Sequence, residues 1–167
     1  DGGMMISASH NPGKYNGIKM VGSKGVPISG ETGIYEIGKM IENLPAKSAG
    51  KKGKITKTDL LQAYIEHSLR YSTEKLKKFK LVIDTANGMG GLVVNDFFKK
   101  IGCDITHLYP ELDGNFPNHE ANPLKEENLS DLQETVRKEK ADLGIAFDGD
   151  ADRCIFVDEL GKTVSSD

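Results

Sequence analysis

The chain has 167 residues, 37% of them hydrophobic and 28% charged, which suits one folded domain with a piece of another. Its 22 basic and 25 acidic side chains leave a net charge of −3, which argues against general nucleic-acid binding, because that needs lysine and arginine to neutralise phosphates. No apolar run approaches the ~20 residues that span a bilayer, and no signal peptide is visible, so we expect no membrane partner. The two cysteines, Cys103 and Cys154, are predicted to be buried thiols of a cytoplasmic protein rather than a disulfide.

Residues 1–45 are predicted to form short strands followed by one helix. Apolar runs indicate a buried strand at 3–8, a second at 18–21 and a possible third at 25–28. From Thr32 onward, four apolar residues recur at spacings of 3, 4 and 3, which is typical of one helical stripe that Pro45 would end. These residues are Ile34, Ile37, Ile41 and Leu44.

Residues 46–57 are rich in lysine and small residues and have no periodic apolar pattern. Five lysines in such a stretch could form a basic binding patch, but a solvated interdomain linker explains the composition better. The lysines are Lys47, Lys51, Lys52, Lys54 and Lys57.

Residues 58–167 alternate between apolar strands and amphipathic helices, which predicts an α/β fold with a mixed or parallel sheet layered with helices. The expected strands are 80–84, 104–109, 142–147 and 154–157, and the expected helices begin near residues 58, 93 and 130. Gly102 is expected to end the second of these helices.

The strongest chemical signal is an aspartate triplet, Asp148, Asp150 and Asp152, directly after an apolar strand. Three carboxylates so close together repel one another unless a cation lies among them. Magnesium is the expected ion, because it takes a few protein carboxylates and completes its shell with water and phosphate oxygens. Arg153 is placed to reach the same phosphate.

A calcium-binding EF-hand loop is the competing interpretation, because Glu159 falls at position 12 when Asp148 is counted as position 1. That loop requires glycine at position 6, where this chain has Arg153, and it requires flanking helices where strands are expected. We therefore favour magnesium over calcium.

A second signal is the tight polar loop that carries Ser9 and His10 after the first strand. A serine fixed at a strand end beside an imidazole is a candidate nucleophile, although a turn with satisfied backbone groups explains the loop equally well. Lys19 could reach the same site if the chain folds back, and His119 lies in a long loop, but either could equally be an ordinary surface or loop residue. The glycines at 88–91 lack the third glycine of a dinucleotide loop and are expected to form a strand-to-helix turn.

A serine loop and an aspartate triplet on an α/β scaffold together favour phosphoryl transfer. The sequence resembles the α-D-phosphohexomutase family in SASHNP at 7–12, YNGIK at 15–19, DGNFPNH at 113–119 and DGDADR at 148–153. Residues 27–33 are most similar to the phosphomannomutase and phosphoglucomutase members, whereas Ser7 also occurs in phosphoglucosamine mutases. The resemblance therefore leaves the hexose open.

The resemblance implies an enzyme that moves a phosphoryl group between the 1- and 6-positions of a hexose phosphate, with Mg²⁺ and a bisphosphate intermediate. Ser9 matches the serine that carries the phosphoryl group and gives the metal an oxygen, and the aspartate triplet matches the metal ligands. Arg153 matches a phosphate-contacting arginine, and His10 and Lys19 match residues beside the phosphoserine, Lys19 being a general acid/base candidate. His119 is a weaker match.

Family members have four domains, whereas this chain resembles the end of domain 1 at 1–45 and domain 2 at 58–167. We therefore expect a fragment that binds Mg²⁺ but turns over hexose phosphate poorly or not at all. Exposed strand edges and apolar surface at 1–45 are expected to permit self-association. Other metal-dependent phosphoryl-transfer enzymes, of the phosphatase or kinase kind, stay open as an alternative.

Overall fold

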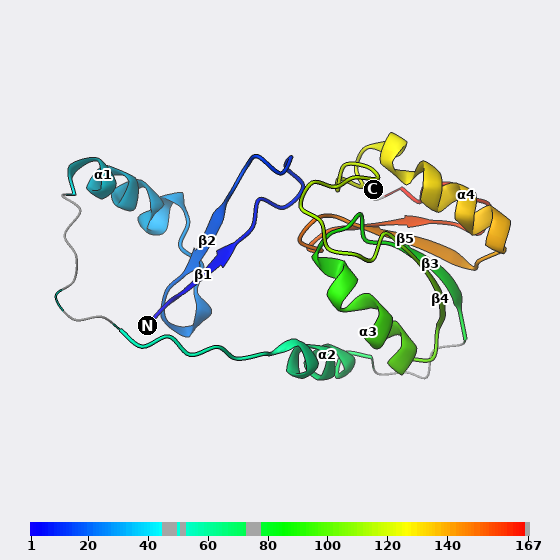
Figure 1. Cartoon of the computed structure of the whole chain (residues 1–167), viewed down its shortest axis with the longest axis horizontal. Helices are drawn as coiled ribbons and strands as arrows, with labels where there is room; N and C mark the ends of the chain where they lie inside the picture. The colour runs from blue at the N-terminus through cyan, green and yellow to red at the C-terminus, as the bar shows by residue number, and fades with distance from the viewer. Residues whose placement is uncertain (45–49, 51–52, 73–77, 166–167) are drawn as a thin grey trace. The chain divides into compact units, whose positions relative to one another are not determined.

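The computed structural model describes residues 1–44, 50, 53–72 and 78–165, which form two compact units (Figure 1). The hairpin unit consists of Asp1–Ser7 and Gly17–Asp59, and the sheet unit consists of Ala8–Asn16 and Leu60–Asp167. Of the linker expected at 46–57, residues 50 and 53–57 are described, and they are exposed and belong to no helix or strand.

The hairpin unit contains two antiparallel strands, β1 (Gly3–Ile6) and β2 (Ile18–Val21). The third strand expected at 25–28 is wrong: only Pro27 forms a bridge, to Val21. Lys24 (φ 61°) and Gly25 (φ 73°) adopt left-handed conformations that turn the chain, and a proline has no N–H to donate to a ladder.

The helix of this unit, α1 (Tyr35–Asn43), begins three residues later than Thr32. One π-helical turn, Gly30–Ile34, precedes it, and the Thr32 hydroxyl accepts a hydrogen bond from the Ser29 amide at 2.7 Å. Gly33, inside this turn, has a φ of 147°, a conformation that favours glycine. None of the residues of α1 is buried.

The sheet unit is built on four strands in the order β4-β3-β5-β6. The strands are β3 (Lys80–Asp84), β4 (Asp104–Leu108), β5 (Leu143–Phe147) and β6 (Cys154–Val157). Strand β3 is parallel to β4 and to β5, and β6 is antiparallel to β5. This mixed sheet, covered by helices, confirms the α/β fold expected from the sequence.

Helices pack on both faces of this sheet, because successive strand residues point to opposite faces. The helices are α2 (Leu61–Leu69), α3 (Val94–Lys100) and α4 (Ser130–Glu139), with α3 and α4 on opposite faces (Figure 1). The cluster on the α3 face is Leu81, Ile83, Val94 and Ile145. The cluster on the α4 face is Val82, Leu129, Leu132, Val136, Ala141, Ala146 and Val157. An apolar core thus lies on each face of the sheet.

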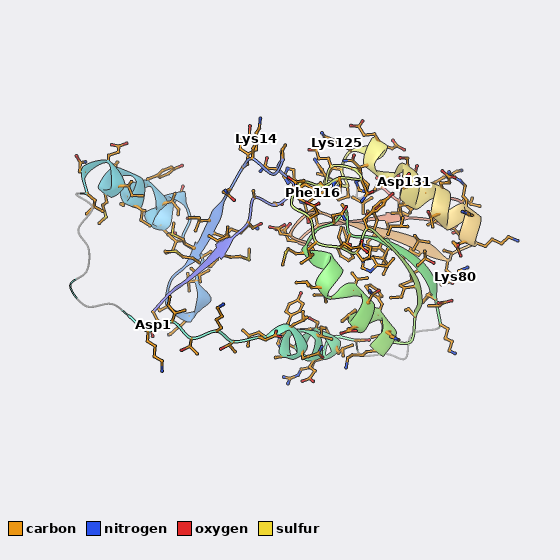
Figure 2. The ribbon with its side chains drawn as sticks, in the orientation of Figure 1. Asp1, Lys14, Lys80, Phe116, Lys125 and Asp131 are labelled. Carbon is orange, nitrogen blue, oxygen red and sulfur yellow. The ribbon has the colours of Figure 1, made fainter. Side chains whose placement is uncertain are left out.

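The carboxyl ends of the parallel strands β3 and β5 meet at one edge of the sheet. Lys80 begins β3 at the far end, whereas Phe116 lies in a loop near this edge (Figure 2). This is the end at which α/β sheets place their ligand sites.

Both cysteines are free thiols, as expected. Cys103 is only half-buried, and the expectation of a buried thiol is wrong for Cys154, which is exposed. The reason is its place at the start of the edge strand β6. Among the described residues, the helices are too short or too polar to cross a bilayer.

Candidate active site

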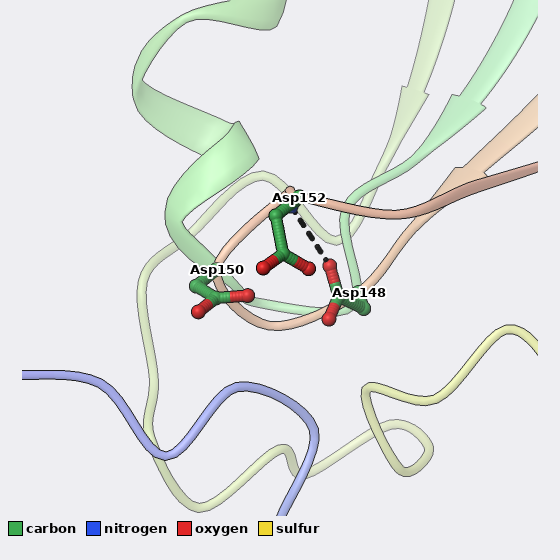
Figure 3. A group of neighbouring side chains, drawn as sticks. All are labelled: Asp148, Asp150 and Asp152. Atoms are coloured by element: carbon green, nitrogen blue, oxygen red, sulfur yellow. Dashed lines mark hydrogen bonds between the residues drawn. The ribbon is translucent and has the colours of Figure 1, made fainter. Parts of the chain in front are cut away.

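The aspartate triplet lies in the loop between β5 and β6, at the carboxyl end of β5. One carboxylate oxygen from each aspartate lies within 4.8 Å of the others, and the three side chains converge (Figure 3). Asp148 is buried, Asp150 is half-buried and Asp152 is exposed, so the cluster runs from the protein interior to solvent.

Asp148 is fully buried and is held by both of its carboxylate oxygens. Its Oδ1 accepts hydrogen bonds from the backbone amides of Asp152 and Arg153, each at 3.1 Å. Its Oδ2 accepts from Ser9 Oγ at 2.8 Å and from the Arg153 guanidinium at 2.8 and 3.1 Å. Charge-assisted bonds of this kind offset the cost of burying a carboxylate.

Ser9 is brought to this loop although it lies 139 positions from Asp148 in the sequence. It belongs to Ala8–Asn16, the segment that is part of the sheet unit, and its φ of 54° is unusual for a residue with a side chain. Arg153 Nη2 donates to Ser9 Oγ at 3.0 Å, and His10 Nδ1 lies 3.3 Å from the same oxygen. Arg153 Nη2 also contacts His10 Nδ1. Four predicted site residues therefore meet at one hydroxyl, two of them charged.

The charge of the cluster suits a divalent cation. Three carboxylates against one guanidinium leave a formal surplus of about two negative charges in the loop. All the donors are hard oxygens, which are the ligands that Mg²⁺ and Ca²⁺ prefer. The strands β5 and β6 flank the loop, so it lacks the helices that an EF-hand requires.

The turn that follows β3 contacts the loop that carries the aspartate triplet. Residues 89–92 form a 3₁₀ turn that leads into α3, as expected of a strand-to-helix connection. The Met89 amide donates to the carbonyl of Gly149, between Asp148 and Asp150, at 2.9 Å. A backbone hydrogen bond thus links this turn to the loop of the aspartate triplet.

His119 lies at the carboxyl end of β3, where it pairs with Asp84. Its Nε2 is 2.9 Å from Asp84 Oδ2, and its Nδ1 is 3.0 Å from the carbonyl oxygen of Glu120. The ring also packs edge-on against Tyr109, with 5.4 Å between ring centroids. The sequence analysis missed Asp84, which a carboxylate ending a buried parallel strand could have indicated.

The surroundings of His119 favour its charged form. Burial acts to lower the pKa of His119, but the hydrogen bond and charge of Asp84, the Glu120 carbonyl and the charge of Asp131 outweigh it, so the pKa is raised. Asp131 also accepts a hydrogen bond from Tyr109 at 2.5 Å, which, with burial of the phenol, raises the pKa of Tyr109 to about 12. Each ring nitrogen of His119 faces an oxygen, and these contacts link the loop of His119 to the end of β3.

Lys19 lies on β2 of the hairpin unit, paired with Met5. Its predicted acid/base role is therefore an expectation from the family motif alone.

Comparison with known proteins gives consistent matches over both units. The model of phosphoglucomutase/phosphomannomutase alpha/beta/alpha domain I matches residues 1–47, and that of domain II matches residues 62–161. A phosphomannomutase of Vibrio cholerae is 44% identical over 98% of this chain and 37% of the relative. A phosphoglucomutase of Neisseria gonorrhoeae is 40% identical over 99% of this chain and 35% of the relative.

A solved structure agrees with these sequence matches. A phosphoglucomutase/phosphomannomutase family protein from Burkholderia thailandensis has 36% identity and a TM-score of 0.86 over 98% of this chain and 35% of its own. The chain thus spans well under half the length of the relatives it matches. Two family models that together match most of its residues show that this chain belongs to the phosphoglucomutase/phosphomannomutase family of α-D-phosphohexomutases.

Proposed function

We propose that this chain is the part of a phosphohexomutase that carries the phosphoryl group on Ser9. The observation that carries the proposal is the convergence of Ser9 Oγ, Asp148 Oδ2 and the Arg153 guanidinium within 3.1 Å. Family membership supports the same assignment. The whole enzyme would interconvert hexose 1-phosphate and hexose 6-phosphate through a hexose bisphosphate.

The proposed transfer starts from phosphorylated Ser9. The bond between phosphorus and Ser9 Oγ breaks while a bond forms to a hydroxyl oxygen of the sugar phosphate. The proton of that hydroxyl is taken up by a basic group and ends on Ser9 Oγ, and Lys19 and His10 are the candidate carriers. The bisphosphate then turns over and returns its other phosphoryl group to Ser9 by the reverse steps.

The residues around Ser9 suit this chemistry. The Arg153 guanidinium, which donates to Ser9 Oγ, can bind the equatorial phosphoryl oxygens on which the transition state carries its charge. Asp148 accepts from Ser9 Oγ and so orients the hydroxyl. Asp148, Asp150 and Asp152, with an oxygen of Ser9, would hold Mg²⁺, and the ion would supply charge neutralisation to the phosphoryl group.

The proposed substrate is a hexose phosphate, with mannose or glucose favoured over glucosamine by the names of the matched relatives. The chain spans 37% of the length of the Vibrio relative, so we treat the activity of a whole phosphohexomutase as a proposal. We therefore propose that the 167-residue chain accepts a phosphoryl group on Ser9 but turns over hexose phosphate poorly.

The test is intact mass with peptide mapping after incubation with glucose or mannose 1,6-bisphosphate and Mg²⁺. We expect one added phosphate confined to Ser9 and absent in Ser9→Ala, whereas Ser29→Ala in the hairpin unit keeps it. Phosphate released to water with none retained on Ser9 would instead favour the phosphatase-like alternative.

Metal binding is tested separately with Mn²⁺ as a spectroscopic probe for electron paramagnetic resonance. Asp148→Asn should weaken Mn²⁺ binding by more than ~10-fold, because it removes a buried charged ligand. Asp158→Asn is the matched control, because that carboxylate only orders the turn after β6. Equal affinity in the two variants would show that the triplet is not the metal site.

A further inference from the structure

Gly149, inside the metal-binding loop, has no room for a side chain. A Cβ atom there would lie 2.2 Å from the carbonyl oxygen of Ser9 and 3.4 Å from Phe116 Cζ. The first contact is far inside van der Waals distance and involves backbone, which cannot rotate aside. The φ of Gly149 lies outside the left-handed region, so the constraint is the close approach rather than the conformation.

A second glycine makes the same kind of contact from the serine segment itself. A Cβ atom on Gly13 would lie 2.5 Å from the carbonyl oxygen of Gly114, in the loop after β4. Gly13 also has no positive φ. The segment Ala8–Asn16 therefore touches the sheet unit backbone-to-backbone at two points, one of them at Ser9 itself.

We propose that Gly149 and Gly13 are positioning residues that seat Ala8–Asn16 against the sheet unit, so that Ser9 Oγ lies 2.8 Å from Asp148 Oδ2. To bring the Gly149 contact from 2.2 Å to the 3.0 Å limit of real Cβ contacts, alanine must push Ser9 away by 3.0 − 2.2 = 0.8 Å or more. Ser9 would then lose its place between Asp148 and Arg153.

The position of Ser9 should affect the rate at which it is phosphorylated, an expectation that rests on the proposed function. Misplacing a reacting group by ~1 Å can lower a rate by about 100-fold. We therefore expect Gly149→Ala to slow phosphorylation of Ser9 by a bisphosphate about 100-fold.

The direct test is the side-chain NMR spectrum of the four histidines, which gives both a local reporter and folding controls. His10 contacts Ser9 and Arg153 and reports the seating. His107 bonds Thr85 and His119 bonds Asp84, so their signals report whether the sheet unit is folded. In Gly149→Ala and in Gly13→Ala we expect the His10 signals to move while those of His107 and His119 stay.

The matched control is Gly114→Ala, whose Cβ would have no heavy atom within 4 Å. It should leave all of the histidine signals and the phosphorylation rate unchanged. If Gly149→Ala also moves the signals of His107 and His119, the sheet unit has misfolded in that variant. The Gly13→Ala spectrum then tests the positioning role. Unmoved His10 signals in a folded Gly149→Ala or Gly13→Ala variant would overturn the proposal.

The spectrum also separates this inference from the proposed function. If the wild-type chain takes no phosphate on Ser9 but the His10 signals still move in both variants, the seating stands and the proposed phosphorylation of Ser9 in this chain does not. If Ser9 is phosphorylated equally fast in wild type and in both variants, the two glycines have no positioning role.

Discussion

Each unit of the chain has an amphipathic helix, but the apolar side chains of the helix are buried in one unit and exposed in the other. In α4 of the sheet unit, Leu132 and Val136 are both 0% exposed. In α1 of the hairpin unit, Ile41 is 67% exposed and Leu44, just after the helix, is 61% exposed. No described residue of the hairpin unit is buried. An apolar stripe therefore predicts an amphipathic helix, but it does not predict that the stripe is buried against another element.

The difference has a simple physical origin. The sheet unit has helices on both faces of its sheet, so the central strands β3 and β5 are buried on both faces. The described residues of the hairpin unit form two short strands and one α-helix, and an isolated two-stranded hairpin is at best marginally stable in water.

The largest effect should come from core truncation. Leu132→Ala should lower the free energy of unfolding of the sheet unit by about 2–5 kcal/mol, because it removes a fully buried side chain and leaves a cavity. Ile41→Ala, in the hairpin unit, should change the free energy of unfolding of the chain by less than about 0.5 kcal/mol, because Ile41 is already exposed. Urea unfolding followed by far-UV circular dichroism measures both. Equal losses of stability in Leu132→Ala and Ile41→Ala would contradict the difference in burial between the two units.

Replacing a glycine by alanine should destabilise the sheet unit at one position and stabilise the hairpin unit at another. A Cβ on Gly144 in β5 would lie 2.8 Å from Val136 Cγ2, so Gly144→Ala should destabilise the sheet unit by about 1–3 kcal/mol. Gly38 in α1 has open space, so Gly38→Ala should stabilise the helix by about 0.5–1 kcal/mol. Urea midpoints test the first, and helical signal at 222 nm the second. Destabilisation by both changes would refute this prediction.

The ion pair at the end of β3 should make sheet-unit stability depend on pH. Because the pKa of His119 is raised on folding, its contribution is fully present below the unfolded value of about 6.5 and is lost as pH rises through the folded value. Burial lowers the pKa of His107, which contributes a slope of the opposite sign, so the comparison must be with a variant. His119→Gln should lower the free energy of unfolding by about 1 kcal/mol at low pH and change it little at high pH.

The control for this measurement is His67→Gln, on the exposed surface of α2. It should follow the wild-type curve between pH 5 and 9 in urea titrations. A His119→Gln curve parallel to that of the wild type would show that the imidazolium contributes nothing.

The smallest effect should be self-association through the hairpin unit. In the described part of the chain β1 is an edge strand, and Met4 on it is 75% exposed. Such an edge can pair with a second copy, so light scattering should show a dimer or larger species at high concentration. Met4→Lys should weaken this association about 10-fold, because a charge on an edge strand opposes pairing. A monomer at all concentrations would contradict the prediction.

The sequence located most elements because their patterns are local. The strands at 80–84 and 154–157 were predicted with the bounds observed, since apolar runs between turn residues are visible without knowing their partners. Residues 25–28 failed as a strand because Lys24 adopts a left-handed turn that composition alone does not reveal. The exposure of Cys154 was missed because strand order within the sheet is not a local property.

By itself, the sequence determined the α/β class, the family and the identity of the candidate serine, aspartates and arginine, because these depend on patterns within a few residues. Only the tertiary structure decided that Ser9 meets Asp148 across 139 positions, and that His119 pairs with Asp84. It also decided that Gly149 must be glycine, since the Ser9 carbonyl occupies the place of its side chain. Contacts between distant segments depend on how layers pack, and no short stretch of sequence encodes that.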